Sequence, residues 1–298
     1  MNDQPVASLL RFVAFARQAE ERLGLAEGAL LVAEAAYPTL DQRRYWRRLD
    51  ALAAAVRPEL GLARGATLPA EQLSARETAE RVCLALREVL AGREGFHGNQ
   101  EEYYHPRNSF LNEVLESKSG LPITLCIVYI EVARRLGAPL VGVGLPAHFL
   151  AKWPLSPDEG DDLFVDAFNG TLLDLAECRE FAQRLTSAAG AASHIDPEWL
   201  EPASNRSVLT RLLHNLKHAY LQRGETAAAL DMVERLVILR PDLPEELRDR
   251  GLLRLALGEV LLAAADIAAY AQRVPAAPEV RRLCKRMAAI GEVQSKLN

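Results

Sequence analysis

The chain has 298 residues, of which 49% are hydrophobic and 25% are charged, a composition typical of a soluble globular protein of about two domains. The formal net charge of −5 provides no global positive field, so we expect neither nucleic acid nor a membrane surface as a partner. The four cysteines lie far apart, and no stretch resembles a signal peptide or a membrane span of roughly 20 apolar residues, so the sequence predicts a cytoplasmic protein without a disulfide framework.

The first hundred residues predict a helical region. Apolar stripes occur at residues 9–15 and 25–36, and Pro38 follows the second stripe. The residue before a proline avoids helical geometry, so the helix is expected to end there. Two more helices are predicted over about residues 41–56 and 74–91. The first of these two carries arginines between acidic residues, a pattern that favours a solvated helix face over a nucleic-acid surface.

A buried helix is predicted over residues 123–136, because this run is apolar on nearly all sides until its last turn. Pro122 suits the first position of the helix, where its missing N–H does no harm. Gly137 is expected to end the helix. Just upstream, Asn108 or Ser109 is expected to cap a shorter helix that ends near residue 116.

Three short strands are predicted after the buried helix. They cover residues 139–144, 148–153 and 163–167, which are rich in Val, Leu, Phe and Trp. A buried helix beside an antiparallel sheet is an α+β arrangement. The sequence therefore predicts an α+β core over residues 101–200, preceded by the helical N-terminal region of residues 1–100.

The last part of the chain, residues 205–298, contains an internal repeat. Gly224 and Gly258 are 34 residues apart, and Pro241 and Pro275 have the same separation. A period of 34 with a turn glycine and a closing proline is typical of tetratricopeptide repeats, which have two helices per unit. Two such units leave an apolar face uncovered, so we expect them to pack on the rest of the chain or to bind a partner.

Two polar residues on neighbouring predicted strands can carry chemistry. His148 begins one strand and Asp166 ends the next, 18 residues later, so a hairpin would bring the two side chains together. Asp166 would then accept a hydrogen bond from the imidazole and fix its tautomer. A nucleophile at the N-terminus of the buried helix would be activated by the unpaired backbone amides and by such a histidine.

Five short strings carry a resemblance to a known family. They are Gly95-Phe96-His97-Gly98-Asn99, Pro106-Arg107-Asn108-Ser109-Phe110-Leu111-Asn112-Glu113-Val114-Leu115, Gly120-Leu121-Pro122-Ile123-Thr124-Leu125, Pro146-Ala147-His148-Phe149-Leu150 and Asp166-Ala167-Phe168-Asn169-Gly170. Together they resemble the SirB-type family, in which a transglutaminase-like domain precedes tetratricopeptide repeats. The resemblance extends over nearly the whole chain. It implies an α+β fold with a helical N-terminal region, a degenerate transglutaminase/papain-like core with a small antiparallel sheet, and C-terminal repeat hairpins.

The resemblance also implies where a catalytic nucleophile would stand. Counting back 15 residues from Gly137, the usual offset in transglutaminase cores, reaches Pro122, which has no thiol. Cys126 lies one turn further along the helix, a displacement of about 6 Å. Family members commonly carry glycine before the histidine and proline after the aspartate, where this chain has Ala147 and Ala167.

These residues favour a non-enzymatic interaction or regulatory protein that binds an unknown protein partner through its C-terminal repeats and needs no cofactor. The alternative is a cysteine hydrolase or acyltransferase that uses Cys126, His148 and Asp166. A third hypothesis is a ligand-binding cleft around His148. The candidate cleft-lining residues are Asn108, Glu113, Pro122 and Asn169. No metal site is predicted, because His214 and His218 have ligand spacing but fit a solvated helix face better.

Overall fold

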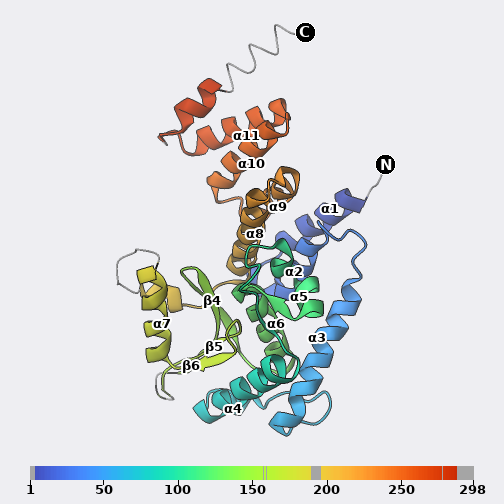
Figure 1. Cartoon of the computed structure of the whole chain (residues 1–298), viewed down its shortest axis with the longest axis vertical. Helices are drawn as coiled ribbons and strands as arrows, with labels where there is room; N and C mark the ends of the chain where they lie inside the picture. The colour runs from blue at the N-terminus through green and yellow to red at the C-terminus, as the bar shows by residue number, and fades with distance from the viewer. Residues whose placement is uncertain (1–3, 157, 159, 189–195, 277, 287–298) are drawn as a thin grey trace. The chain divides into compact units, whose positions relative to one another are not determined.

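The structure is a computed structural model that describes residues 4–156, 158, 160–188, 196–276 and 278–286 (Figure 1). Two compact units can be distinguished. The first, here called the core unit, comprises residues 19–212, and the second, the repeat unit, combines residues 1–18 with residues 213–298. The N-terminal helix thus belongs with the C-terminal repeats.

The core unit is rich in helices, and its longer ones follow the predicted segments. The α-helices are α2 (Leu25–Ala33), α3 (Gln42–Val56), α4 (Arg76–Arg87), α5 (Leu111–Ser117), α6 (Pro122–Arg135) and α7 (Leu175–Ala188). Short 3₁₀ turns occur at Glu20–Arg22, Arg57–Leu60, Ala70–Gln72, Pro106–Ser109 and Pro197–Leu200, and a π-turn occurs at Glu88–Arg93. Pro122 is the first residue of α6, as predicted, and residues 122–133 of this helix are all buried.

The cap predicted for the short helix α5 is wrong. Asn108 and Ser109 lie in the 3₁₀ turn before it, and the N-cap of α5 is Phe110, which makes no side-chain capping bond. The Asn108 amide is instead engaged with the loop of residues 99–103. It donates to the carbonyls of Glu102 and Tyr103, at 2.6 and 3.1 Å.

The strands β3 (Val141–Leu145), β4 (His148–Trp153), β5 (Leu163–Asp166) and β6 (Thr171–Leu173) form one antiparallel sheet in this order. The first three confirm the predicted strands, and β6 was not predicted. The sheet lies between α6 on one side and α7 on the other (Figure 1). Under α7, a buried cluster includes Leu150 of β4 and Phe164 of β5.

A second, parallel pairing joins β1 (His97–Gly98) to β2 (Ser119–Gly120). The Gly98 N–H donates to the carbonyl of Phe168 at 3.0 Å. A Cβ atom added at Gly98 would lie 2.4 Å from the Phe168 ring, so glycine is required for this close approach. Three of the five motif strings therefore meet here.

The hairpin between β3 and β4 turns through Pro146 and Ala147, because Leu145 pairs with His148. Ala147 has a φ of 55°, the left-handed region that favours glycine. Proline followed by a residue with positive φ is the pattern of a type II turn. The turn explains why glycine is the common residue before this histidine, and it implies that Ala147 is strained.

We expect Ala147→Gly to raise the free energy of unfolding by about 1 kcal/mol, because glycine adopts positive φ without a Cβ clash. Ala147 is exposed, so no packing is lost. Denaturant unfolding of both proteins measures the difference. The control is Ala54→Gly at an exposed position inside α3, which should lower stability by about 1 kcal/mol. A loss of stability in both variants would contradict the strain at residue 147.

The repeat unit confirms the predicted helical hairpins. Its helices are α1 (Gln4–Ala16), the C-terminal part of α8 (Asn205–Gln222), α9 (Thr226–Leu239), α10 (Pro244–Ala256) and α11 (Val260–Arg273). Gly224 and Gly258 stand at the two turns with φ of 73° and 82°. Helix α1 packs against α9, where the Arg235 guanidinium lies over the Phe12 ring at 5.8 Å. None of the described helices combines the length and the hydropathy that crossing a membrane requires.

Candidate functional site

His148 and Asp166 form the hydrogen-bonded pair predicted from their spacing. His148 Nε2 lies 3.0 Å from Asp166 Oδ1, and the two residues are on the adjacent strands β4 and β5. Both side chains are buried, with 7% of His148 and 1% of Asp166 exposed. Water therefore competes little for this bond.

Asp166 also holds the turn that follows β5. Its Oδ1 accepts from the backbone N–H groups of Phe168 and Asn169, at 3.0 and 3.2 Å. Its Oδ2 accepts from the Asn169 side-chain amide at 2.7 Å. Burial acts to raise the pKa of Asp166, but the hydrogen bond from His148 and its charge, together with the Asn169 donors, hold this pKa below its ordinary value. The group is a carboxylate, so His148 Nε2 carries the shared hydrogen.

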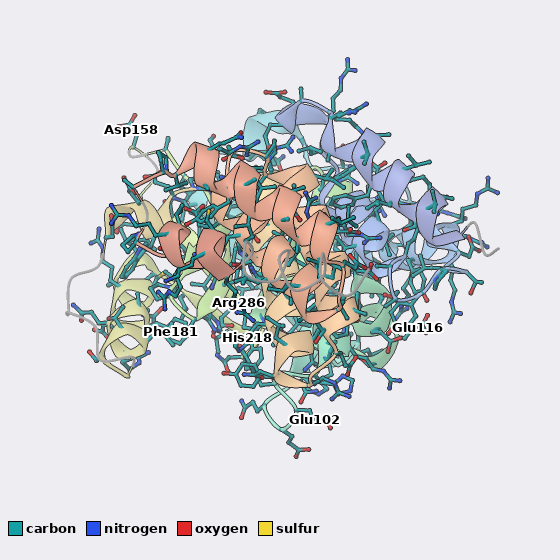
Figure 2. All side chains as sticks on the ribbon, turned by 90° about the horizontal axis from the view of Figure 1, so that it is seen from above. Glu102, Glu116, Asp158, Phe181, His218 and Arg286 are labelled. Carbon is teal, nitrogen blue, oxygen red and sulfur yellow. The ribbon has the colours of Figure 1, made fainter. Side chains whose placement is uncertain are left out.

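The imidazole faces the side of the sheet that α7 covers. Alternate residues of a strand share a face, so His148 lies on the same face as Leu150, which packs under α7. The His148 ring makes an edge contact with Phe181 of α7 at 4.9 Å and with Phe168 at 5.9 Å. Figure 2 shows Phe181 on the α7 ribbon. The imidazole is thus enclosed by aromatic rings.

Cys126 approaches the sheet from the opposite side, on α6. The residue is fully buried, and its thiol donates to the carbonyl oxygen of Phe149 at 3.4 Å. Burial raises the pKa of the Cys126 thiol, and the negative charge of Asp166 raises it further. A thiol of this kind is a poor source of thiolate at neutral pH. Its hydrogen bond goes to the backbone of β4 rather than to the imidazole.

The first turn of α6 carries no thiol. Pro122 is buried at its first position. Two residues later, the Thr124 hydroxyl is completely buried and has no hydrogen-bond partner among the described residues. The position where the transglutaminase offset places a nucleophile is therefore occupied by an apolar ring.

The four candidate cleft-lining residues lie in different surroundings. Asn169 contacts the pair through Asp166. Asn108 orders the loop of residues 99–103, Glu113 faces Arg107 at 3.8 Å, and Pro122 begins α6. A cleft shared by all four with His148 stays a prediction.

Sequence reasoning missed Arg211, which fastens the β3–β4 turn. Its Nη2 donates to the carbonyls of Leu145 and His148, at 2.8 and 2.7 Å, and its guanidinium lies over the Phe149 ring at 5.5 Å. These contacts fix the backbone from which the imidazole projects. One signal was available: Arg211 falls on the apolar side of its helix, three residues after the buried Val208.

The two histidines with ligand spacing have protein partners. His214 Nε2 lies 2.6 Å from Glu246 Oε1, and His218 Nε2 lies 2.8 Å from the Gln222 amide. Within the described ranges, no group of three or more His, Cys, Asp or Glu side chains is arranged to hold a metal ion. His214 therefore serves to join α8 to α10 within the repeat unit.

Comparisons with known proteins agree with this architecture. Residues 43–214 match the model of the Transglutaminase-like superfamily, and residues 216–288 match a Tetratricopeptide repeat model. A UPF0162 protein of Xylella fastidiosa is 37% identical over 262 residues, which cover 88% of each chain. A UPF0162 protein of Pseudomonas aeruginosa is 32% identical over 75% of this chain and 74% of that protein. F-box only protein 21 of Mus musculus is 32% identical over 147 residues, 47% of this chain and 22% of that protein.

Proposed function

Because the chain belongs to the Transglutaminase-like superfamily, with tetratricopeptide repeats after that domain and UPF0162 proteins as homologues, we propose that it is a non-enzymatic protein-interaction or regulatory protein. Its core unit would be a degenerate relative of the cysteine enzymes. This architecture is consistent with the SirB-type resemblance of the five motif strings.

The state of Cys126 is the observation that carries the proposal. A working cysteine enzyme needs a thiolate beside a general base. Cys126 is fully buried, and its thiol is bonded to the Phe149 carbonyl on the α6 side of the sheet. His148 is enclosed on the α7 side, where its Nε2 is engaged by Asp166. The Cys126 thiol thus bonds to the backbone of β4, and His148 Nε2 lies beside Asp166, which supports a core unit without a working cysteine–histidine pair.

The repeat unit supports the interaction half of the proposal. Tetratricopeptide repeats stack into surfaces that commonly bind other proteins. At the turn between α10 and α11, Leu257, Leu261 and Leu262 are exposed, and 84% of Leu261 faces solvent. Exposed apolar side chains of this kind mark interaction surfaces.

We expect Cys126 to react with iodoacetamide on the order of a hundredfold more slowly than Cys284 in the native protein, because only the thiolate of an accessible cysteine reacts rapidly. Cys284 is exposed and serves as the positive control. Cys83 and Cys178 are buried, with pKa values raised to about 12 by burial, and serve as the slow controls. Mass spectrometry of timed samples gives the rate at each site.

The opposite outcome would favour the cysteine hydrolase or acyltransferase. In that case iodoacetamide would alkylate Cys126 rapidly, with a pH dependence that His148→Ala abolishes.

A second measurement addresses the interaction role in a strain that lacks this chain. Cys126→Ala should restore the phenotype fully, whereas the double variant Leu261→Asp and Leu262→Asp should not. The proposal would be contradicted if Cys126→Ala failed to restore the phenotype and the double variant did restore it.

A further inference from the structure

The core unit contains a cavity of about 350 Å³ beside the motif strings. Its walls come from the end of α4 and the π-turn after it, from β1, and from the turn between β5 and β6. Figure 1 shows α4 next to β5 and β6. The residues that matter for its chemistry are Arg87, Glu88, Phe96, His97, Phe168 and Asn169. A volume of this size suits a small organic molecule.

Arg87 supplies the positive charge of the cavity. Across the ranges that the structure describes, its guanidinium has neither a hydrogen bond nor an ion pair, although the side chain is half-buried. Burial raises the pKa of the Tyr129 hydroxyl, and the positive charge of the nearby Arg87 offsets part of this rise. A half-buried guanidinium without a partner in the protein is available to pair with an anionic ligand.

The other walls limit the kind of ligand. Glu88 also lines the cavity, and its carboxylate lies 3.6 Å from Arg93. Glu88 repels any anion, and it repels a dianion such as phosphate more strongly than a ligand with a single negative charge. The half-buried Phe168 ring adds apolar surface to the same space, whereas Phe96 is only 1% exposed. The cavity therefore combines one guanidinium, one carboxylate and aromatic surface.

We propose that this cavity binds a small monocarboxylate with an apolar body, whose carboxylate pairs with the Arg87 guanidinium while its body rests on the Phe168 ring. A planar carboxylate can accept two parallel hydrogen bonds from arginine, which a point acceptor cannot. The His97 Nδ1 donates to the Gly95 carbonyl at 2.9 Å, so Nε2 of the neutral ring is an acceptor and the carboxylate is bound through Arg87 alone. The proposal does not depend on the absence of catalysis.

Asn169 connects the cavity with the buried pair. It lines the cavity, and its side-chain amide donates to Asp166 Oδ2 at 2.7 Å. Asp166 in turn bonds to His148 at 3.0 Å. Occupancy of the cavity is therefore expected to shift the NMR resonances of the His148 imidazole, a readout that requires no enzymatic activity.

The test is a titration of the full chain with benzoate and with hexanoate, followed by calorimetry and by the His148 resonances. We expect saturable binding of both acids and no measurable binding of benzyl alcohol, which has the same ring without the carboxylate. Arg87→Gln should weaken binding at least about tenfold, the value of a charge-assisted bond. The matched control is Arg81→Gln, an exposed arginine on the same helix, which should bind as the parent protein does.

A second variant fills the cavity without relying on charge. A Cβ atom added at Gly92 would meet only the Glu88 side chain, at an ordinary 3.5 Å, so Gly92→Leu should fold normally and abolish binding. Equal unfolding midpoints of the variants and the parent protein confirm intact folds. The proposal is overturned if neither acid binds, if Arg87→Gln binds as tightly as Arg81→Gln, or if benzyl alcohol binds as tightly as benzoate.

Discussion

Asp166→Ala is expected to lower the free energy of unfolding by about 3–5 kcal/mol, because it leaves several buried donors without an acceptor at about 1–3 kcal/mol each. The carboxylate accepts from His148, from two backbone N–H groups and from the Asn169 side chain. Without it, these buried donors lose their acceptor. Urea unfolding, followed by circular dichroism, gives the difference between the two proteins.

The exposed neighbour Asp161 is the control for this experiment. Asp161→Ala should change stability by no more than about 0.5 kcal/mol, as is usual for surface positions. If Asp166→Ala lowered the free energy of unfolding as little as Asp161→Ala, the His148–Asp166 pair would not stabilise the fold. A role in catalysis alone would then be favoured.

The same pair predicts a pH dependence. The pKa of Asp166 is lower in the folded protein than in the unfolded chain, where it is about 3.9. The carboxylate therefore contributes its stabilisation above that unfolded value, and the contribution is lost as the pH falls through the folded pKa. The difference in stability between the parent protein and Asp166→Ala should narrow as the pH falls below about 4. A difference independent of pH would contradict this assignment.

Glu131→Ala is expected to have an effect of similar size, about 3–5 kcal/mol. Glu131 projects from α6 and is 2% exposed. Its Oε1 accepts from the Ala26 N–H at 3.1 Å, and its Oε2 accepts from Arg135 at 2.7 Å. The N-cap of α2 is Gly24, which has no capping side chain. Glu131 therefore caps α2 from another helix while neutralising a largely buried arginine.

Two variants separate these contributions in thermal and urea unfolding. Glu131→Gln keeps an acceptor for Ala26 but loses the charge, so its cost should be smaller than that of Glu131→Ala. Arg134→Gln removes the more exposed partner of Glu131, whose side chain is 62% exposed, and should cost less than about 1 kcal/mol. If Arg134→Gln lowered the free energy of unfolding as much as Glu131→Ala, burial of Glu131 would not be the source of the large effect.

Local patterns were sufficient for the elements that carry many consecutive signals. The apolar run after Pro122 predicted α6, and the paired glycines at 224 and 258 predicted the helical hairpins of the repeat unit. The pairing of His97 with Ser119 escaped prediction, because β1 and β2 have two residues each and show no periodic pattern. β1 and β2 form only because two segments that are separate in the sequence pair in the folded chain. Local sequence patterns do not predict that pairing.

The candidate site could be predicted only in part for a related reason. The spacing of His148 and Asp166 predicted their contact, since a hairpin brings them together. The face of the sheet on which His148 lies depends on the strand register, because a shift of one residue moves every side chain of the strand to the opposite face. That the Cys126 thiol bonds to the Phe149 carbonyl rather than to the imidazole therefore emerged only from the structure. The cavity around Arg87 likewise combines three segments that no local pattern connects.

The close approach of Gly98 to the Phe168 ring constrains how homologous chains can diverge. With 2.4 Å between an added Cβ atom and the ring, a side chain at position 98 requires a smaller residue at position 168. Substitutions at the two positions are therefore expected to be correlated across the family. Lineages that keep phenylalanine should keep the glycine, and a lineage that loses the glycine should have lost the aromatic ring first.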